Sequence, residues 1–332
     1  MGRVVVPAEH GPHAGCWMAL PHLAEEWPDL AAAQQETLAL AAAIAETEPV
    51  TLLVPPGTSV PELPPGVNAT PAFYGDAWTR DTAPLLGREG ERPVAVCFRF
   101  DGWGGRYLMA GDDELAPWLA GTLGVPVRRS TLVGEGGGLE LDGEGTLLLT
   151  RDSWVDSPRA NPEAREIESE LRELLGVDAF IWLEGTLRND HTDGHVDTLA
   201  RFVRPGEVVV MAPEAGDPNA EMLAGLAEQL EGASDARGRR LRVHRIPGPG
   251  PVLDAEGALL PASYVNYYLA EDQVLVPSYG VAADEPAREA LEALFPERRV
   301  RSVAARAILQ GGGALHCVTH EIPAFARRRT TP

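Results

Sequence analysis

The sequence predicts a mixed α/β fold built from roughly five strand–helix units. Short apolar runs of strand length recur along the chain, and each lies near a segment with helical periodicity. The runs lack regular polar alternation, which is typical of strands that are buried on both faces. They occupy residues 50–54, 94–98, 146–150, 208–211 and 273–276.

Helix-start and helix-stop residues mark the segments between these strands. The clearest helix is expected from Asn161 as N-cap, with Pro162 at its first helical position and Gly176 as its stop. Its apolar residues, which fall on one face, are Ile167, Leu171, Leu174 and Leu175. The other expected helices occupy residues 284–295 and about 30–47, 112–123 and 219–231.

The length of the chain bears on its domain organisation. At 332 residues it exceeds the usual size of a single core, so either two domains or one domain of repeated units is expected. A hydrophobic content of 44% excludes a disordered chain. The Pro- and Gly-rich linkers at 55–66 and 247–251 are short. Since neither marks a boundary, we expect one domain spanning residues 1–332.

The overall charge restricts the partners. A net charge of -21 and a pI near 4.7 disfavour nucleic acid and favour small cations. All 28 basic residues are arginine, so Schiff-base, pyridoxal-phosphate and Walker-lysine chemistry is excluded. The terminal run Arg327-Arg328-Arg329 is interpreted as a solvated tail. With no signal peptide and no apolar run long enough to span a bilayer, a soluble cytoplasmic protein without a membrane partner is expected.

One cysteine is a candidate nucleophile. Cys16, Cys97 and Cys317 are scattered without CxxC spacing, which indicates free thiols rather than disulfides or a thiolate zinc site. Directly before Cys317 stands the run Gly311-Gly312-Gly313, where a ligand or another strand can approach the main chain closely. A thiol and a histidine far apart in the sequence suggest nucleophilic catalysis.

The candidate acid–base partner lies in residues 189–197. If this segment is extended, alternate side chains point the same way, so His191, Asp193, His195 and Asp197 would share one wall. Such a wall could also hold a metal ion, although no HExxH helix and no second cluster accompany it. A solvated turn with a purely structural role is the third interpretation.

Three further stretches combine acids or aromatic residues with small residues, as functional loops do. They are residues 76–84, 100–105 and 134–140. Trp78 is flanked by polar residues and is a candidate site residue, whereas core packing is an equal alternative for Trp103. The glycine-rich stretch around Glu135 is a poor phosphate loop, because no Lys-Ser/Thr follows it.

Together, six motifs resemble those of the agmatine deiminases and the bacterial peptidylarginine deiminase-like proteins of the guanidine-modifying superfamily. The motifs are residues 7–18, 78–82, 135–137, 192–197, 262–268 and 311–317, in the order of the family. The resemblance covers nearly the whole chain. It implies a five-bladed α/β propeller (pentein fold) of ββαβ units around a pseudo-fivefold axis, with the active site at the central channel.

The resemblance also implies roles for individual residues. Cys317 is the nucleophile that forms a covalent thiouronium, and His195 is the acid and base. Asp81 and Asp197 bind the guanidinium, a planar cation that matches carboxylates, and Glu135 orients His195. The other residues expected at the substrate are Trp78, His191, Asp193 and Gly312. No cofactor and no metal are implied.

The resemblance predicts a hydrolase that converts agmatine to N-carbamoylputrescine and ammonia. One departure stands before His195, where agmatine deiminases carry two acids and this chain has Asp190-His191. If that position faces the distal amine, His191 puts agmatine in doubt; otherwise Asp190 or Asp193 takes over, or His191 is a surface residue. Free or peptidyl arginine is the alternative substrate. A metal-dependent hydrolase and a silent guanidine-binding homologue are the alternatives of another class, and a homo-oligomer is compatible with the sequence.

Overall fold

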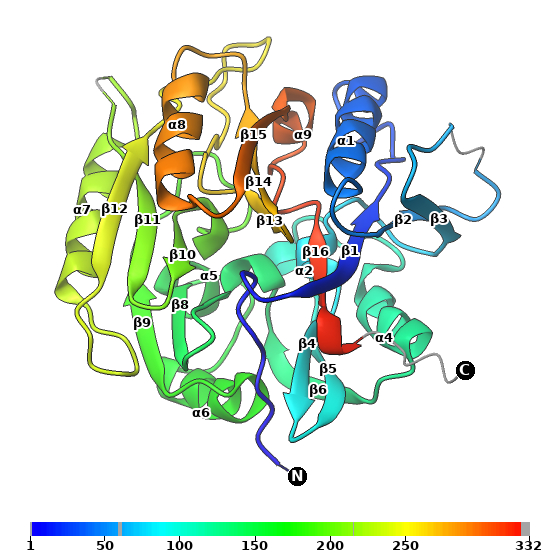
Figure 1. The fold of residues 1–332 in the computed structure, drawn as a ribbon, viewed down its shortest axis with the longest axis horizontal. Coiled ribbons are helices and arrows are strands. Elements are labelled where there is room, and N and C mark those ends of the chain that lie inside the picture. Colours follow the sequence, from blue (N-terminus) through cyan, green and yellow to red (C-terminus); the bar gives the residue numbers. More distant parts are fainter. Residues whose placement is uncertain (1, 59–61, 215, 327–332) are drawn as a thin grey trace.

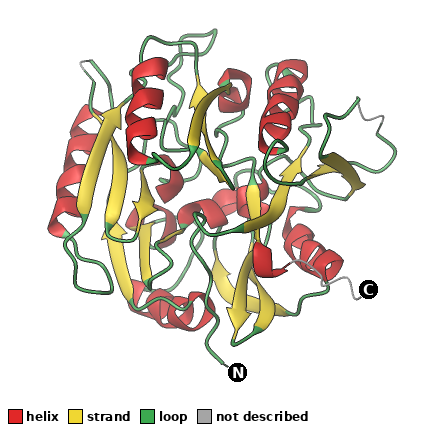
Figure 2. Cartoon of the chain, viewed as in Figure 1, coloured by secondary structure: helices red, strands yellow, loops and turns green. Residues whose placement is uncertain are grey.

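The computed structural model describes residues 2–58, 62–214 and 216–326, and over these residues it has a mixed α/β fold with five separate sheets. Figure 1 shows the long helices at the periphery and the strands nearer the middle, and Figure 2 distinguishes the two by colour. The run Arg327-Arg328-Arg329 lies outside the described residues. No helix in the described ranges combines the length and the apolar character that crossing a bilayer requires.

Four sheets share one order of elements: two antiparallel strands, a peripheral helix, and a third strand parallel to the second. A helical crossover is the usual way to return the chain for parallel pairing. The units are β4 (Leu85–Glu89), β5 (Arg92–Arg99), α4 (Asp112–Leu123) and β6 (Val127–Val133); β7 (Glu140–Leu141), β8 (Thr146–Thr150), α6 (Ala164–Leu175) and β9 (Ala179–Leu183); β10 (Ala200–Arg204), β11 (Glu207–Ala212), α7 (Ala220–Gly232) and β12 (Arg242–Pro247); β13 (Tyr268–Ala270), β14 (Gln273–Ser278), α8 (Asp284–Leu294) and β15 (Arg299–Ala304).

The fifth sheet joins segments from both ends of the chain. Its strands, in spatial order, are β16 (His320–Pro323), β1 (His13–Ala19), β2 (Val50–Val54) and β3 (Val67–Pro71), with α1 (Leu30–Ile44) between β1 and β2. Strand β1 pairs antiparallel with β16, so that Trp17 lies opposite His320, and parallel with β2. The blue β1 and the red β16 lie side by side in Figure 1.

Short helical turns occupy the connections. They are α2 (Thr79–Thr82), α3 (Gly102–Gly105), η1 (Gly136–Gly138), α5 (Arg151–Trp154), η2 (Val196–Thr198), α9 (Arg306–Gln310) and η3 (Ala324–Ala326). Of these, α2, η1, η2 and α9 each stand where the chain passes from one sheet to the next. These passages carry the candidate site residues.

The five predicted strands are confirmed as β2, β5, β8, β11 and β14. Each lies in the interior of its sheet, with a hydrogen-bonded neighbour on either side. Their apolar runs are buried, as in Leu147, Leu148 and Leu149, none of which is exposed to solvent. The predicted helices are confirmed as α1, α4, α6, α7 and α8.

The expected start of α6 is wrong. The helix begins at Ala164 after Glu163, not at Pro162 after Asn161. Instead of capping the helix, Asn161 accepts a hydrogen bond from the Val133 amide (2.9 Å) and donates one to the Val133 carbonyl (2.7 Å). One side-chain amide satisfies both backbone groups at the end of β6, which outweighs a cap that satisfies one N–H. The predicted stop is confirmed, since Gly176 ends the helix in the left-handed conformation.

The three cysteines are free and buried, as the sequence indicated. Cys16 lies on β1 and donates to the Trp17 carbonyl at 3.3 Å, and Cys97 lies on β5. Both belong to strands that pack in the interior. Only Cys317 lies in a connection between sheets, close to the other polar groups of the candidate site.

Candidate active site

The five passages between sheets bring the candidate site residues together. Each passage contributes at least one polar side chain: Asp81 from α2, Glu135 before η1, His195 and Asp197 around η2, Asn266 before β13, and Cys317 after α9. These side chains are all buried. The fold thus converts five distant stretches of sequence into one cluster.

Cys317 lies under the glycine run and beside two polar side chains. Asn266 Nδ2 donates to its Sγ at 3.3 Å, and Asp197 Oδ2 is 3.7 Å from Sγ. A Cβ placed on Gly313 would stand 3.0 Å from this sulfur, so the run provides the close main-chain approach that the sequence indicated. Burial raises the pKa of the Cys317 thiol well above its ordinary value, and the Asp197 and Asp81 carboxylates raise it further. Without a ligand the thiol is therefore protonated at neutral pH.

Asp81 and Asp197 flank one small space. Asp81 accepts hydrogen bonds from the Gly137 amide (2.9 Å) and from Trp103 Nε1 (3.0 Å). A Cβ on Gly137 would stand 2.8 Å from Asp81 Oδ1 and 3.2 Å from Asp197 Oδ2, so only glycine leaves this space open. Asp197 Oδ1 is buried and has no hydrogen-bond partner in the described chain. Two buried carboxylates on either side of a gap can accept the N–H groups of a planar cation.

His195 is held between acidic groups. Its Nε2 is 3.4 Å from Glu135 Oε2, and its Nδ1 is 3.7 Å from Asp81 Oδ1. Arg159 Nε donates to both oxygens of Glu135, at 3.0 and 2.9 Å. Burial alone would lower the pKa of His195, but the Asp81 and Glu135 carboxylates outweigh it and raise that pKa to about 9. The imidazolium is therefore a proton donor at neutral pH.

The expectation that residues 191–197 form one extended wall is wrong. The segment turns sharply, with positive φ at Asn189, Asp193 and Gly194, and then enters η2. His195 and Asp197 reach the cluster, whereas the Asp193 carboxylate is bound by Arg106 (2.7 Å) and Arg159 (3.2 Å). Asp193 is not among the residues that line the pocket described below, and neither are Glu135, His195 and Asp197, so its contact with substrate stays a prediction.

The metal-site interpretation depended on His191, Asp193, His195 and Asp197 sharing one wall, and these side chains do not do so. Within residues 2–58, 62–214 and 216–326, no group of three or more His, Cys, Asp or Glu side chains is arranged to hold a metal ion. Asp190, which could take over from the acid that position 191 lacks, is bonded to the backbone instead. Its carboxylate accepts hydrogen bonds from the Thr192 and Gly194 amides. Its bonds stabilise the turn that separates His191 from His195.

A pocket of about 180 Å³ opens onto this cluster. Cys317 and Asp81 lie on it together with the aromatic side chains of Trp78, Trp103 and Tyr107. The other lining residues are Glu26, Asp76, Met109, His191, Thr192, Gln310, Gly311, Gly312 and Gly313. Three of the residues predicted to contact substrate, Trp78, His191 and Gly312, thus lie at the pocket, and Trp103, for which core packing was the equal alternative, lines it as well.

An aromatic pair shapes one side of the pocket. Trp78 stacks on Trp27 with ring centroids 5.3 Å apart, and both indole N–H groups donate to Asp76, at 3.0 Å from Trp27 and 3.1 Å from Trp78. His191 is exposed and stacks on Tyr107 at 5.5 Å. A pocket with rigid aromatic walls and a few carboxylates suits an elongated cation.

Sequence reasoning missed the lining residues Tyr107, Met109 and Gln310, and it assigned no role to four further residues with polar side chains at the site. Asp76 lies in a stretch that was singled out, but its place in the pocket was not foreseen. Asn266 also lies in a recognised motif, with no role assigned. Glu26 and Arg159 stand in loops without any local pattern, and they reach the site only through the fold. For those two, the sequence carries no signal.

Comparison with known proteins agrees with the geometry. The profile of the Porphyromonas-type peptidyl-arginine deiminase family matches residues 5–323. The agmatine deiminase of Stutzerimonas stutzeri is 38% identical over 353 residues, covering 96% of this chain and 95% of the relative, and that of Ectopseudomonas mendocina is 37% identical with the same coverage. The structure of Enterococcus faecalis agmatine deiminase superposes with a TM-score of 0.90 at 28% identity, covering 96% of each chain. This chain belongs to the Porphyromonas-type peptidyl-arginine deiminase family.

Proposed function

We propose that this protein is an agmatine deiminase, which hydrolyses agmatine to N-carbamoylputrescine and ammonia. The observation that carries the proposal is the charge of the pocket. Asp81 lies on it beside the thiol, and Asp76 and Glu26 add two carboxylates. Although burial raises the pKa of Asp76 to about 6, its carboxylate is ionised at neutral pH. Agmatine carries a guanidinium, an ammonium and no acid, which matches this lining.

The same lining disfavours the alternative substrates. Free arginine has an α-carboxylate that needs a cation, but no arginine is among the described lining residues, and the sequence has no lysine. A peptidyl arginine has no ammonium to pair with Asp76 and Glu26. The similarity to proteins named agmatine deiminases supports the same choice.

The first half of the proposed reaction forms a covalent intermediate. The guanidinium binds between Asp81 and Asp197, which offsets the two charges that keep the thiol protonated. The thiol then releases its proton to solvent, and Cys317 Sγ attacks the central carbon. The imidazolium of His195 donates its proton to the leaving nitrogen, which departs as ammonia. A thiouronium remains on Cys317.

The second half consumes water. Neutral His195 takes one proton from the water that attacks the thiouronium carbon. The C–S bond then breaks with its electron pair on sulfur, and the second proton of the water leaves the urea oxygen and restores the thiol, which releases the substituted urea. Glu135, held by Arg159, keeps the imidazole in place and favours its protonated form. One water enters and one ammonia leaves, with no change of oxidation state.

We propose further that the five sheets are blades of a five-bladed α/β propeller, and that residues 1–332 form one catalytic domain. Four units repeat the same order of elements, and the fifth is assembled from β16, β1, α1 and β2. The candidate site residues come from the five passages between sheets. Such a placement is expected if the passages surround a common axis.

Ammonia release across a panel of guanidines tests the proposed function. We expect kcat/KM for agmatine to exceed the values for free arginine, a peptidyl arginine and methylguanidine by at least about tenfold, because only agmatine satisfies both ends of the pocket. Equal rates for arginine and agmatine would contradict the assignment of substrate.

Treatment with a thiol-modifying reagent and treatment with a chelator serve as controls that distinguish a thiol enzyme from a metal enzyme. A thiol enzyme is inactivated by iodoacetamide or a haloacetamidine and keeps its activity after exhaustive chelation. Loss of activity on chelation alone would instead establish a metal-dependent hydrolase. A protein that releases no ammonia from any guanidine would be a binding homologue.

The substitution His191→Glu tests whether this position contacts the ammonium. We expect a lower KM for agmatine, because a carboxylate replaces a basic ring on the pocket lining. Since His191 is exposed, the gain is about 0.2 to 1 kcal/mol, or at most about fivefold in KM. It should shrink as salt rises and as pH falls through the range in which the new carboxylate is protonated.

The neutral variant His191→Gln is the matched control, because it changes the shape without adding a negative charge. Its KM should fall less than that of His191→Glu, and neither change should affect a guanidine with an uncharged tail. Equal KM values for agmatine in all three proteins would mean that position 191 does not contact the amine.

A further inference from the structure

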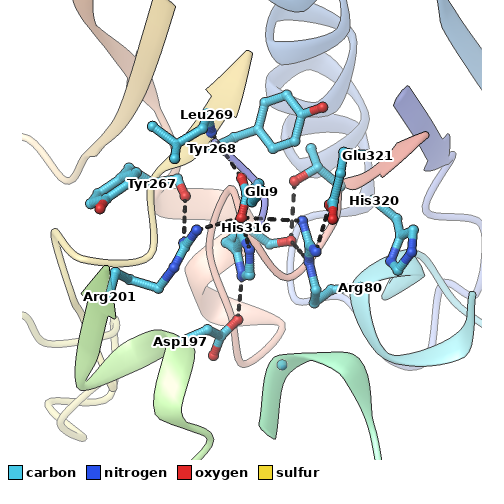
Figure 3. A network of polar contacts seen from close by, with 12 residues as sticks. Glu9, Arg80, Asp197, Arg201, Tyr267, Tyr268, Leu269, His316, His320 and Glu321 are labelled. Atoms are coloured by element: carbon cyan, nitrogen blue, oxygen red, sulfur yellow. Dashed lines mark hydrogen bonds and ion pairs between the residues drawn. The ribbon is translucent and has the colours of Figure 1, made fainter. Parts of the chain in front are cut away.

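A chain of buried contacts runs behind Asp197 and away from the pocket. His316 lies between two carboxylates, with Nδ1 2.7 Å from Asp197 Oδ2 and Nε2 2.8 Å from Glu9 Oε2 (Figure 3). The imidazole is 2% exposed. It precedes the nucleophile directly in the sequence, but it does not line the pocket, and the reaction steps above do not use it.

These contacts fix the charge of the ring. Ionised carboxylates only accept hydrogen bonds, so both nitrogens of His316 must donate, and the ring is an imidazolium. Glu9 is ionised: burial alone would raise its pKa, but Arg201, His316 and Arg80 lower it well below its ordinary value. Burial alone would raise the pKa of Asp197, but the hydrogen bond and charge of His316, together with the charges of His195 and Arg201, lower it.

The part of this contact network that lies farthest from the pocket is held by further hydrogen bonds and ion pairs. Glu9 accepts a hydrogen bond from the Leu269 amide at 3.0 Å and pairs with Arg201. Arg201 in turn donates to the Tyr267 carbonyl at 3.0 Å (Figure 3). It also donates to Glu140 Oε2 at 2.7 Å, and it is fully buried. A ring whose two nitrogens are bonded to fixed partners cannot turn away from Asp197.

Asp197 depends on this support. Rotation of a carboxylate about its last torsion is soft, so its orientation must come from its partners. Among the described residues, His316 donates the only N–H bond to the Asp197 side chain, and the Cys317 thiol is its other polar contact. The bond occupies Oδ2 and leaves buried Oδ1 without a partner. A buried acceptor without a donor is costly, and a substrate N–H would complete it.

We propose that His316 is a positioning residue, whose imidazolium holds the Asp197 carboxylate ionised and oriented for the guanidinium. This inference rests on the proposed deimination at Cys317. The titratable and charged groups that act on Asp197 are His316 and Arg201 behind it and His195, Asp81 and the Cys317 thiol in front. Of these, only His316 donates a hydrogen bond to the carboxylate without taking part in the chemistry.

Two variants distinguish the contact of His316 with Asp197 from its contact with Glu9. In His316→Asn, the new side-chain amide nitrogen would stand about where Nδ1 does and can still donate to Asp197, whereas His316→Gln reaches toward Glu9 instead. We expect kcat/KM for agmatine to fall by at most about tenfold in His316→Asn and by about a hundredfold or more in His316→Gln. Equal losses in the two variants, or no loss in either, would overturn the proposal.

The acid limb of the pH profile of kcat/KM is a second readout. Both variants remove a cation that favours ionised Asp197, so Asp197 should bind a proton at higher pH and the limb should move to higher pH. A residue that only stabilised the fold would not move it. If His316→Gln does not fold, His316→Asn decides alone, and an unmoved acid limb in that variant overturns the proposal.

His320→Asn is the matched control. His320 is a buried histidine near the same chain end, but its Nε2 lies 3.0 Å from the Pro84 carbonyl and its ring stacks on Trp17, with no carboxylate on either nitrogen. This variant should lose stability and keep the wild-type acid limb. A wild type that releases no ammonia from agmatine would refute the proposed function. If the wild type is active and the acid limbs of the His316 variants do not move, only the role of His316 is refuted.

Discussion

Replacing Cys317 with alanine or serine is expected to reduce ammonia release by on the order of 10⁴-fold or more, while the protein stays folded. The physical reason is that no other nucleophile is in place at the gap between Asp81 and Asp197. The polar contacts of the Cys317 sulfur, with Asn266 and Asp197, are weak, so the buried side chain can be replaced by one of similar or smaller size without unfolding the protein. Turnover and thermal unfolding of each variant are the measurements.

The other two cysteines are the controls for this result. Cys16 and Cys97 are buried on strands, so their alanine variants should lower the free energy of unfolding by about 1 to 2 kcal/mol and leave kcat unchanged. Wild-type turnover in either Cys317 variant would remove the covalent mechanism.

The substitution Gly137→Ala should lower kcat/KM by about a hundredfold or more, although it adds a single methyl group. The new Cβ would stand 2.7 Å from His195 Nδ1 and 2.8 Å from Asp81 Oδ1, closer than such atoms approach. Gly137 does not have a positive φ, so backbone strain is no part of the effect. Either the imidazole of His195 or the carboxylate of Asp81 must move out of place, and kcat/KM for agmatine measures the result.

A helical glycine provides the matched control. Gly225 lies within α7, and a Cβ there meets no atom within 4 Å, so Gly225→Ala should keep full activity and stabilise the helix by about 0.5 to 1 kcal/mol. If Gly137→Ala is as active as Gly225→Ala, the gap between Asp81 and Asp197 is not the place where substrate binds.

The sequence predicted the interior of each sheet better than its edges. Strands β5 and β8 are buried on both faces and therefore read as continuous apolar runs. Edge strands such as β3 and β12 mix exposed and buried residues and give no such run. The five-unit count was obtained from the interior strands, whereas the pairing of β1 with β16 leaves no local trace.

Candidate site residues could be named from the sequence where a single local motif indicates their role. Cys317 is marked by its glycine run, and His195 and Asp197 by their dense ionisable cluster. The assumption of an extended segment failed because Asp193 and Gly194 turn the chain, and this turn depends on bonds to distant Arg106 and Arg159. Contacts between distant loops cannot be read from local spacing.

The pairing of β1 with β16 has a consequence for folding during synthesis on the ribosome. Strand β1 emerges long before its antiparallel partner, which begins at His320, and the nucleophile precedes that partner strand by three residues. Until the last strand emerges, β1 presents an unpaired edge, which is a site for association with other nascent chains. Contacts so distant along the chain also form slowly. Strand β16 must therefore be synthesised before the active site can exist, and a nascent chain stalled short of residue 317 has no nucleophile.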